Sequence, residues 1–308
     1  MLPVAIPPVR LSVTLPSFGP YLEDDWRQLC DLARMAEDAG VDELTVPDHV
    51  VMGPNTDAYR WGRFPYPPDA PWMEPLTAIT AMATVTERVR FMTGILIAPL
   101  RNPALLAKTA ATVDVLSGGR LDLGVGIGWQ REEFAAAGVA FEGRGARMDD
   151  LLGACRALWT DSPASYSSPT VSFEEIWCEP KPVRPGGVPL WFSGTLTDRT
   201  LDRMTRLGDG FIPIMGRTLD GVSEDGERIR EAWSAVGRDP DLLEVAATLP
   251  LEKSADGGFD LGATLDGLDA LADAGVTLAQ TNLAVFARSL GDAPAFFADL
   301  GRRLATRR

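Results

Sequence analysis

Strand-like and helix-like segments alternate eight times along this chain, and this alternation restricts its fold most strongly. Short apolar runs are each followed by a longer segment with helical spacing of apolar residues. This pattern predicts one (β/α)8 TIM-barrel domain over residues 1–308, with a doubly wound parallel sheet as the alternative. The expected strands are 11–15, 43–46, 89–95, 121–125, 189–193, 210–213, 243–249 and 278–285, and the expected helices are 24–39, 75–86, 103–116, 145–159, 198–207, 219–236, 265–274 and 294–304.

Two long insertions interrupt this pattern, one after strand two and one before strand five, at residues 52–72 and 161–185. In a barrel, the first lies at the carboxyl ends of the strands, where barrel enzymes carry their active sites. Long segments without regular structure in a compact domain are usually functional. The first insertion contains five aromatic residues and therefore predicts a wall for a flat organic substrate, with packing beneath a long loop as the alternative. These residues are Tyr59, Trp61, Phe64, Tyr66 and Trp72.

The charge and hydropathy of the chain argue against several kinds of partner. The formal net charge is −14 at pH 7, whereas nucleic acids and anionic membranes both favour a basic surface. No apolar run approaches the roughly 20 residues of a membrane helix, and segment 1–8 lacks the basic start of a signal peptide. We therefore expect a cytoplasmic protein that binds neither nucleic acid nor membrane. The scarcity of lysine relative to arginine suggests a GC-rich, actinobacterial source.

A loop dotted with glycines follows the fourth expected strand. Gly124, Gly126 and Gly128 precede Trp129. Positions without a Cβ atom would let a flat ring or an anion approach backbone N–H groups. A Rossmann dinucleotide site needs a sixth-position glycine, where Trp129 stands here, so NAD is not the leading cofactor.

The same stretch resembles the fourth strand and following loop of the bacterial luciferase-like oxidoreductases, which are TIM barrels that use FMN or the deazaflavin coenzyme F420. The similarity lies in residues 119–134 and extends to residues 46–49, 193–195 and 208–211, so it spans most of the chain. The resemblance implies a cofactor at the carboxyl end of the barrel and a small organic substrate.

His49 is the only histidine, so any imidazole chemistry must involve it. The resemblance implies that Asp48 and His49 lie beside the cofactor ring. His49 would hydrogen-bond the ring or the substrate and stabilise charge as a hydride moves, and Asp48 would orient the imidazole or contact the cofactor. The alternative is a structural histidine that caps a loop.

The resemblance also implies which residues surround the cofactor ring. The third strand would support the ring at a non-proline cis peptide bond, which by position is Gly94–Ile95; the alternative is an ordinary strand with one glycine. The expected residues along the ring are Thr93, Gly94, Ile95, Gly126, Ile127 and Gly128, and those expected to contact the substrate are Trp61, Phe64 and Trp129.

One turn is expected to hold the cofactor phosphate, and a second is expected to lie along the cofactor tail. The first follows strand six and begins a helix, where backbone N–H groups and an arginine would bind an anion. The other follows strand five and resembles a Gly-Gly turn of the family, with serine in place of the first glycine. The expected residues are Met215, Gly216 and Arg217 in the first turn and Ser193, Gly194 and Thr195 in the second.

The leading hypothesis is an F420-dependent oxidoreductase that transfers a hydride between the deazaflavin and a small organic substrate. An FMN-dependent monooxygenase and a non-catalytic barrel that binds a phosphorylated ligand are the alternatives. No metal site is expected, and a homodimer is left open. Arg131, Glu132 and Glu133 receive no catalytic role, because acidic residues are common in the first turn of a helix.

Overall fold

A computed structural model describes residues 9–22, 25–255 and 257–307. Parallel strands form a closed barrel, in which β1 pairs with β2 and β11, and β3 pairs with β5. Closure leaves no open edge in the barrel and confirms the predicted TIM barrel over the doubly wound sheet. The barrel strands are β1 (Arg10–Thr14), β2 (Glu43–Val46), β3 (Arg90–Thr93) continued by β4 (Leu96–Ile97), β5 (Leu121–Gly126), β8 (Leu190–Gly194), β9 (Gly210–Pro213), β10 (Glu244–Thr248) and β11 (Leu278–Asn282).

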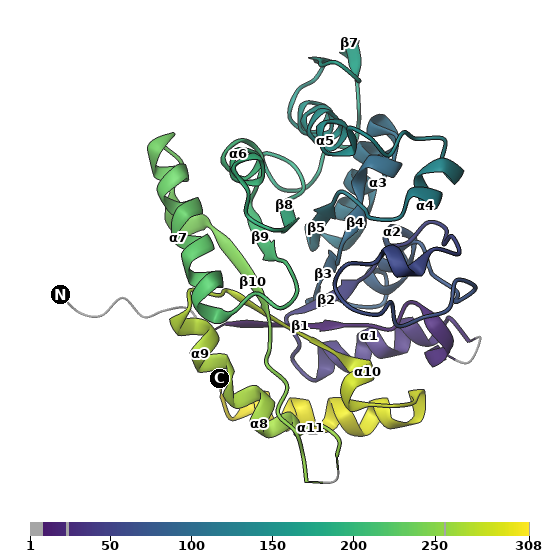
Figure 1. The fold of residues 1–308 in the computed structure, drawn as a ribbon, viewed down its shortest axis with the longest axis vertical. Coiled ribbons are helices and arrows are strands. Elements are labelled where there is room, and N and C mark those ends of the chain that lie inside the picture. Colours follow the sequence, from purple (N-terminus) through teal and green to yellow (C-terminus); the bar gives the residue numbers. More distant parts are fainter. Residues whose placement is uncertain (1–8, 23–24, 256, 308) are drawn as a thin grey trace, which may run out of the picture.

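Helices surround the strands, as Figure 1 shows. Their ends follow local signals: α3 begins at Pro103 after the Asn102 side chain caps Leu105 N–H, and it ends at Gly118, whose φ is 68°. The helices are α1 (Gln28–Asp38), α2 (Pro75–Ala83), α3 (Pro103–Ser117), α4 (Arg131–Ala136), α5 (Arg144–Thr160), α6 (Asp198–Arg206), α7 (Leu219–Ala235), α8 (Leu261–Asp266), α9 (Leu268–Asp273), α10 (Leu283–Phe286) and α11 (Ala293–Ala305). Short 3₁₀ helices lie at Gly19–Leu22, Thr56–Ala58, Ala98–Leu100, Pro240–Leu242 and Leu290–Asp292. No helix in the described ranges is both long enough and apolar enough to cross a membrane.

The structure corrects several expected boundaries. The helix expected at 265–274 starts earlier, at Leu261, and divides at Gly267 into α8 and α9. The strand expected at 278–285 ends at Asn282, because the Asn282 side chain accepts a hydrogen bond from Ala284 N–H and starts α10. The second insertion contains an antiparallel hairpin, β6 (Ala164–Ser167) and β7 (Ser172–Ile176), which projects beside α5 in Figure 1. Segment 1–8 and residue 24, the expected first residue of a helix, lie outside the described residues.

Apolar side chains fill the barrel interior. Met92, Trp191, Ile212, Ala246 and Leu278 form one buried cluster, and each comes from a different barrel strand. A filled interior is a packed core, so ligands must bind at an end of the barrel.

Charged residues occupy the amino-terminal end of the barrel. Arg10, Glu43, Arg90, Asp122 and Glu244 all lie at or next to the first residue of a strand. Arg10 pairs with Glu244 and lies 3.7 Å from Glu43, and Arg90 Nε donates to Asp122 at 3.0 Å. Glu43 is fully buried, and neither of its carboxylate oxygens has a hydrogen-bond partner in the described chain. Burial, together with the negative charge of Asp122, raises the pKa of Glu43 to about 8.

Candidate active site

A large cavity opens at the carboxyl ends of the barrel strands. Its volume is about 1280 Å³, above the range of roughly 300–1,000 Å³ typical of small-molecule sites, so it can hold a cofactor and a substrate together. Every barrel strand contributes a residue at or just beyond its end. These residues are Thr14, Pro47, Ile97, Gly126, Gly194, Pro213, Thr248 and Asn282.

His49 lines this cavity and is held by a buried carboxylate. Its Nδ1 lies 3.2 Å from Oε2 of Glu133, whose side chain has no exposed surface. The other carboxylate oxygen of Glu133 accepts a 2.7 Å hydrogen bond from Val50 N–H. Nε2 of His49 makes no hydrogen bond with the residues that the structure describes. The imidazole is therefore fixed at one nitrogen and available at the other.

Helix α4 supplies this carboxylate and also holds the loop after β2. Gln130 is buried just before α4, and its side chain accepts a 2.7 Å hydrogen bond from Gly53 N–H and donates a 3.1 Å bond to Gly53 C=O. Sequence reasoning missed Gln130 and assigned no role to Glu133. One signal was present: Gln130, Glu133 and Phe134 have the i, i+3, i+4 spacing of a buried helix face.

Asp48 was expected to orient the imidazole of His49 or to contact the cofactor, but its partner in the structure is Arg101. It forms a bidentate pair with Arg101, with Nη2 donating to Oδ1 at 2.7 Å and Nη1 to Oδ2 at 2.5 Å, and it also accepts from Ile97 N–H at 2.8 Å. Glu133, and not Asp48, thus contacts the imidazole. Asp48 lines the cavity and fixes the backbone of β4 beside it. Arg101 was not identified from the sequence.

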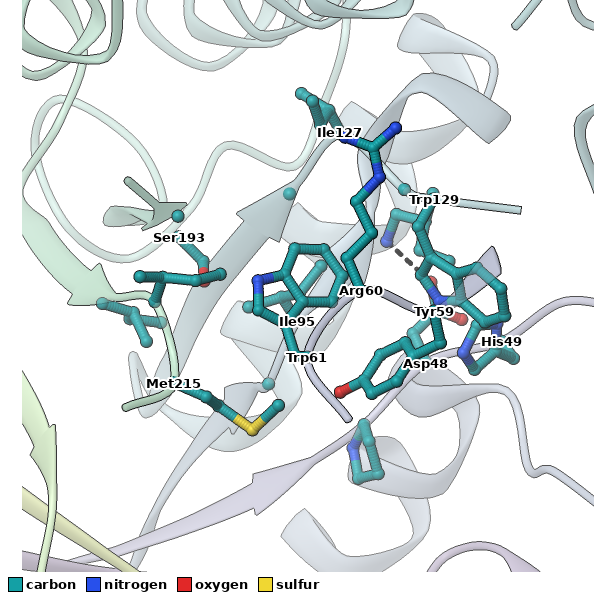
Figure 2. Close-up of a pocket in the computed structure, with 18 of the residues that line it drawn as sticks. Asp48, His49, Tyr59, Arg60, Trp61, Ile95, Ile127, Trp129, Ser193 and Met215 are labelled. Carbon is teal, nitrogen blue, oxygen red and sulfur yellow. Dashed lines mark hydrogen bonds between the residues drawn. The ribbon is translucent and has the colours of Figure 1, made fainter. Parts of the chain in front are cut away.

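The aromatic residues of the first insertion form a wall beside His49. All five line the cavity, which agrees with the predicted wall more than with packing beneath a loop. The ring centroid of His49 lies 4.8 Å from that of Trp72, 5.8 Å from that of Phe64 and 5.9 Å from that of Trp129. Figure 2 shows Trp61 on the near side of the cavity and Tyr59 between it and His49. The wall is apolar and suits a flat organic ligand.

The floor of the cavity includes Gly94 and Ile95, which are joined by the expected cis peptide bond. They interrupt the third barrel strand between β3 and β4. Thr93, expected beside the cofactor, lies beneath this floor instead: it is fully buried, and its hydroxyl donates to Gly124 C=O at 2.8 Å.

The glycines of β5 and of the loop after it also face other parts of the protein. A Cβ atom on Gly124 would overlap Thr93 C=O, one on Gly126 would overlap the Ile95 side chain, and one on Gly128 would lie 2.7 Å from Cγ2 of Ile97. These glycines therefore make room for protein atoms. Gly126 and Gly128 still line the cavity, as does Ile127, whose side chain is 37% exposed.

The turn expected to hold the phosphate and the turn expected along the cofactor tail differ in their access to the cavity. Ser193, Gly194 and Thr195 line it, and a Cβ atom on Gly194 would meet no atom within 4 Å. Met215 also lines it, but Gly216 and Arg217 are not among its described lining residues. Arg217 forms two 3.0 Å hydrogen bonds with Asp225, and this pairing raises its pKa. Of the turn predicted to hold the phosphate, only Met215 thus lines the cavity, whereas all three residues of the turn after β8 do.

The family of this chain follows from comparison with known sequences. The profile of the family described as luciferase-like monooxygenase matches residues 9–252. This chain belongs to that family. The match covers the first seven strands of the barrel and both insertions, in agreement with the resemblance found in the sequence.

Several relatives in this luciferase-like family are actinobacterial. An uncharacterised protein of Mycobacterium tuberculosis is 31% identical over 277 residues, which are 89% of this chain and 92% of that protein. The F420-dependent glucose-6-phosphate dehydrogenase of Nocardia farcinica is 30% identical over 235 residues, which are 74% of this chain and 63% of that protein. These organisms fit the expected source.

Solved structures share the fold at lower identity. The monooxygenase RslO1 from Streptomyces bottropensis matches with a TM-score of 0.78 and 18% identity, over 97% of this chain and 99% of that chain. The coenzyme F420-dependent tetrahydromethanopterin reductase from Methanopyrus kandleri matches with a TM-score of 0.73 and 16% identity, over 96% and 98%. At such identities the comparison supports the luciferase-like barrel itself. The chain is thus an oxidoreductase of this family, whose members use F420 or flavin.

Proposed function

We propose that this protein is an F420-dependent oxidoreductase that transfers a hydride between the deazaflavin and a small organic substrate. The observation that carries the proposal is the buried Glu133–His49 pair, whose imidazole lines a cavity large enough for cofactor and substrate. When bound, F420 would accept or supply a hydride at the carbon that replaces N5 of a flavin.

The residues present fit such a cofactor. The floor at Gly94 and Ile95 would support a flat ring beside His49. At Gly194 the backbone is open to the cavity, because no protein atom occupies the space that a side chain would take, and Ser193 adds a hydroxyl group. These residues would hold the phosphate through backbone N–H groups and one hydroxyl. Arg217 is left out of this site, because Asp225 already occupies its guanidinium.

His49 would handle the proton that accompanies the hydride. Glu133 accepts from Nδ1–H, so the lone pair of Nε2 can accept a proton from a substrate hydroxyl and can later return it. The aromatic rings packed around His49 would shield this nitrogen from water and hold a flat substrate against it.

Sequence identity favours F420 over FMN. The relatives at 30% identity include two F420-dependent glucose-6-phosphate dehydrogenases, from Nocardia farcinica and Amycolatopsis mediterranei. An FMN-dependent monooxygenase is the second candidate, since a solved neighbour with a TM-score of 0.65 is a riboflavin lyase with modified FMN.

Fluorescence titration with each cofactor tests the proposal. We expect F420 to bind more tightly than FMN, and His49→Gln to reduce turnover of secondary alcohols or enones by about 10²–10⁴ while cofactor affinity stays unchanged. Micromolar binding of FMN without any response to F420 would show that the cofactor is the flavin.

A substitution at Glu133 tests the role of the imidazole without a substrate. As a carboxylate, Glu133 accepts from both Val50 N–H and His49 Nδ1–H. Glutamine has one acceptor oxygen, which the shorter bond to Val50 retains, so its amide N–H faces Nδ1. Glu133→Gln should therefore move the imidazole proton from Nδ1 to Nε2 and reduce turnover.

Nitrogen NMR of the untagged protein measures this change directly, because the imidazole of His49 is the only one in the chain. Glu132→Gln is the matched control, because Glu132 lies next in sequence and makes no described contact with the imidazole. An unchanged tautomer in Glu133→Gln would mean that Glu133 does not position His49.

A further inference from the structure

Three arginine side chains converge on one part of the cavity. Arg60 lies in the loop after β2, Arg131 begins α4, and Arg144 begins α5, and all three line the cavity. The ring of Phe141 contacts two of them: its centroid lies 3.7 Å from Cζ of Arg144 and 4.3 Å from Cζ of Arg131. Figure 2 shows Arg60 extending across the cavity toward Ile127. This positive group contrasts with the formal charge of −14 of the whole chain.

Part of this positive charge has no protein partner. Arg144 is held in place, because Nε donates to Gly128 C=O at 3.1 Å and Nη1 to Phe141 C=O at 3.3 Å, but its Nη2 makes no hydrogen bond with any described residue. Arg60 makes neither a hydrogen bond nor an ion pair within the described ranges. Arg131 pairs with Glu142. Arg144 thus offers a fixed donor, and Arg60 a free one.

The three charges repel one another. Burial lowers the pKa of Arg144, and the charges of Arg131 and Arg60 lower it further, opposed by Glu142. Glu132 also lines the cavity, but its stem packs against Gly53. An anion between Arg60 and Arg144 would relieve the repulsion and accept hydrogen bonds from both guanidinium groups.

The position of the arginines indicates which ligand carries the anion. Arg60 stands between Tyr59 and Trp61 of the aromatic wall, and Trp129 lies two residues before Arg131. Ser193 and Met215 lie on the opposite side of Arg60 from Trp129 and His49 in Figure 2, and Ser193 belongs to the turn assigned to the cofactor phosphate. The arginines therefore adjoin the wall where the substrate would bind.

We propose that Arg60, Arg131 and Arg144 form a subsite for an anionic group, a carboxylate or a phosphate, on an aromatic substrate. This inference rests on the proposed function, because it assigns the aromatic wall to the substrate and the turn after β8 to the cofactor.

Benzoate and its neutral analogue benzamide test the subsite by ligand-observed NMR, on protein with and without F420. We expect benzoate to bind about tenfold more tightly than benzamide, the ratio that corresponds to one hydrogen bond to a charged group. Phenyl phosphate in the same titration distinguishes a phosphate subsite from a carboxylate subsite. Arg144→Gln should remove the preference for the anion, and Arg60→Gln should reduce it about threefold or more.

Matched controls separate the subsite from general charge effects. Arg34→Gln changes the net charge equally, but its guanidinium lies on α1 and pairs with Asp31, so the preference should remain. Arg60→Gln keeps the test decisive if Arg144→Gln does not fold, since Arg60 makes no bond in the described structure.

Two results would overturn the inference, and a third would overturn only the proposed function. A preference for benzoate that survives both Arg60→Gln and Arg144→Gln overturns it. Displacement of benzoate by saturating F420, with cofactor binding about tenfold weaker in Arg144→Gln, also overturns it, because the arginines would then bind the cofactor. If neither F420 nor FMN binds but the arginine-dependent preference for benzoate remains, the proposed function fails and the anion subsite stands.

Discussion

Glu43→Gln should stabilise the protein at neutral and alkaline pH. Glu43 is fully buried at the amino-terminal end of the barrel, and both of its carboxylate oxygens lack hydrogen-bond partners in the described structure. The folded protein therefore favours the protonated carboxyl group, and burial, assisted by the charge of Asp122, raises its pKa from 4.5 to about 8. Glutamine has nearly the same shape and carries no charge at any pH, so it avoids the cost of burying the carboxylate.

The pKa gives the size and the pH range of this effect. Each pKa unit corresponds to about 1.4 kcal/mol, so ionising Glu43 in the folded state costs about 5 kcal/mol relative to the unfolded chain. This figure is an upper limit, because Arg10, 3.7 Å away, can move closer when Glu43 ionises. Below pH 4.5 the carboxyl group is protonated in both states and costs nothing. Between pH 4.5 and about 8 only the folded state holds the proton, so the wild-type protein loses stability as the pH rises.

Urea unfolding at a series of pH values between 4.5 and 9 measures the effect. The difference in free energy of unfolding between Glu43→Gln and wild type should grow with pH and level off above pH 8. Glu174→Gln, at an exposed position of β7, is the control and should leave the pH dependence unchanged. A difference that stays flat across this range would refute the reasoning, and it would mean that Arg10 and Arg90 hold Glu43 in its ionised form.

Two further predictions concern the residues around the cavity. Gly94→Ala would place its new methyl group against Cγ2 of Thr45, so we expect a loss of about 1–3 kcal/mol in the free energy of unfolding. Adding Thr45→Ser to Gly94→Ala removes the Cγ2 methyl group of residue 45 and should recover most of the lost stability. Equal unfolding midpoints for wild type and Gly94→Ala would contradict this prediction. Arg101→Leu leaves the Asp48 carboxylate buried without its cation and should cost about 3–5 kcal/mol. Adding Asp48→Leu should recover much of this loss in the free energy of unfolding, measured with urea. An Arg101→Leu variant as stable as wild type would show that the buried Asp48 carboxylate does not need Arg101.

The barrel could be predicted from the sequence because its signals are local. Each strand is a short apolar run, and several helices begin at a capping residue or a proline, as α3 does at Asn102 and Pro103. Hairpin β6–β7 was missed because most of its side chains are at least partly exposed, so it shows no apolar run. The early end of β11 depended on one side chain, Asn282, which caps the next helix.

The site could be predicted only where a residue type or a family motif marked it. His49 was found because it is the only histidine, and the cis bond at Gly94–Ile95 followed from the resemblance. The partners of the site residues were not found, because each contact joins distant parts of the chain. Asp48 and Arg101 are 53 residues apart, and His49 and Glu133 are 84 residues apart.

Glu133 shows why the acidic first turn of α4 was misinterpreted. Glu132 and Glu133 both suit the positive end of a helix, so the local argument treats them alike. The fold separates them, because position 133 faces inward with Phe134 and position 132 does not. A carboxylate on an inward face needs a buried partner, and the chain supplies the imidazole of His49 and the Val50 N–H group. The same inward face presents Gln130 to Gly53, so one short helix fixes both the imidazole and the start of the aromatic loop beside it.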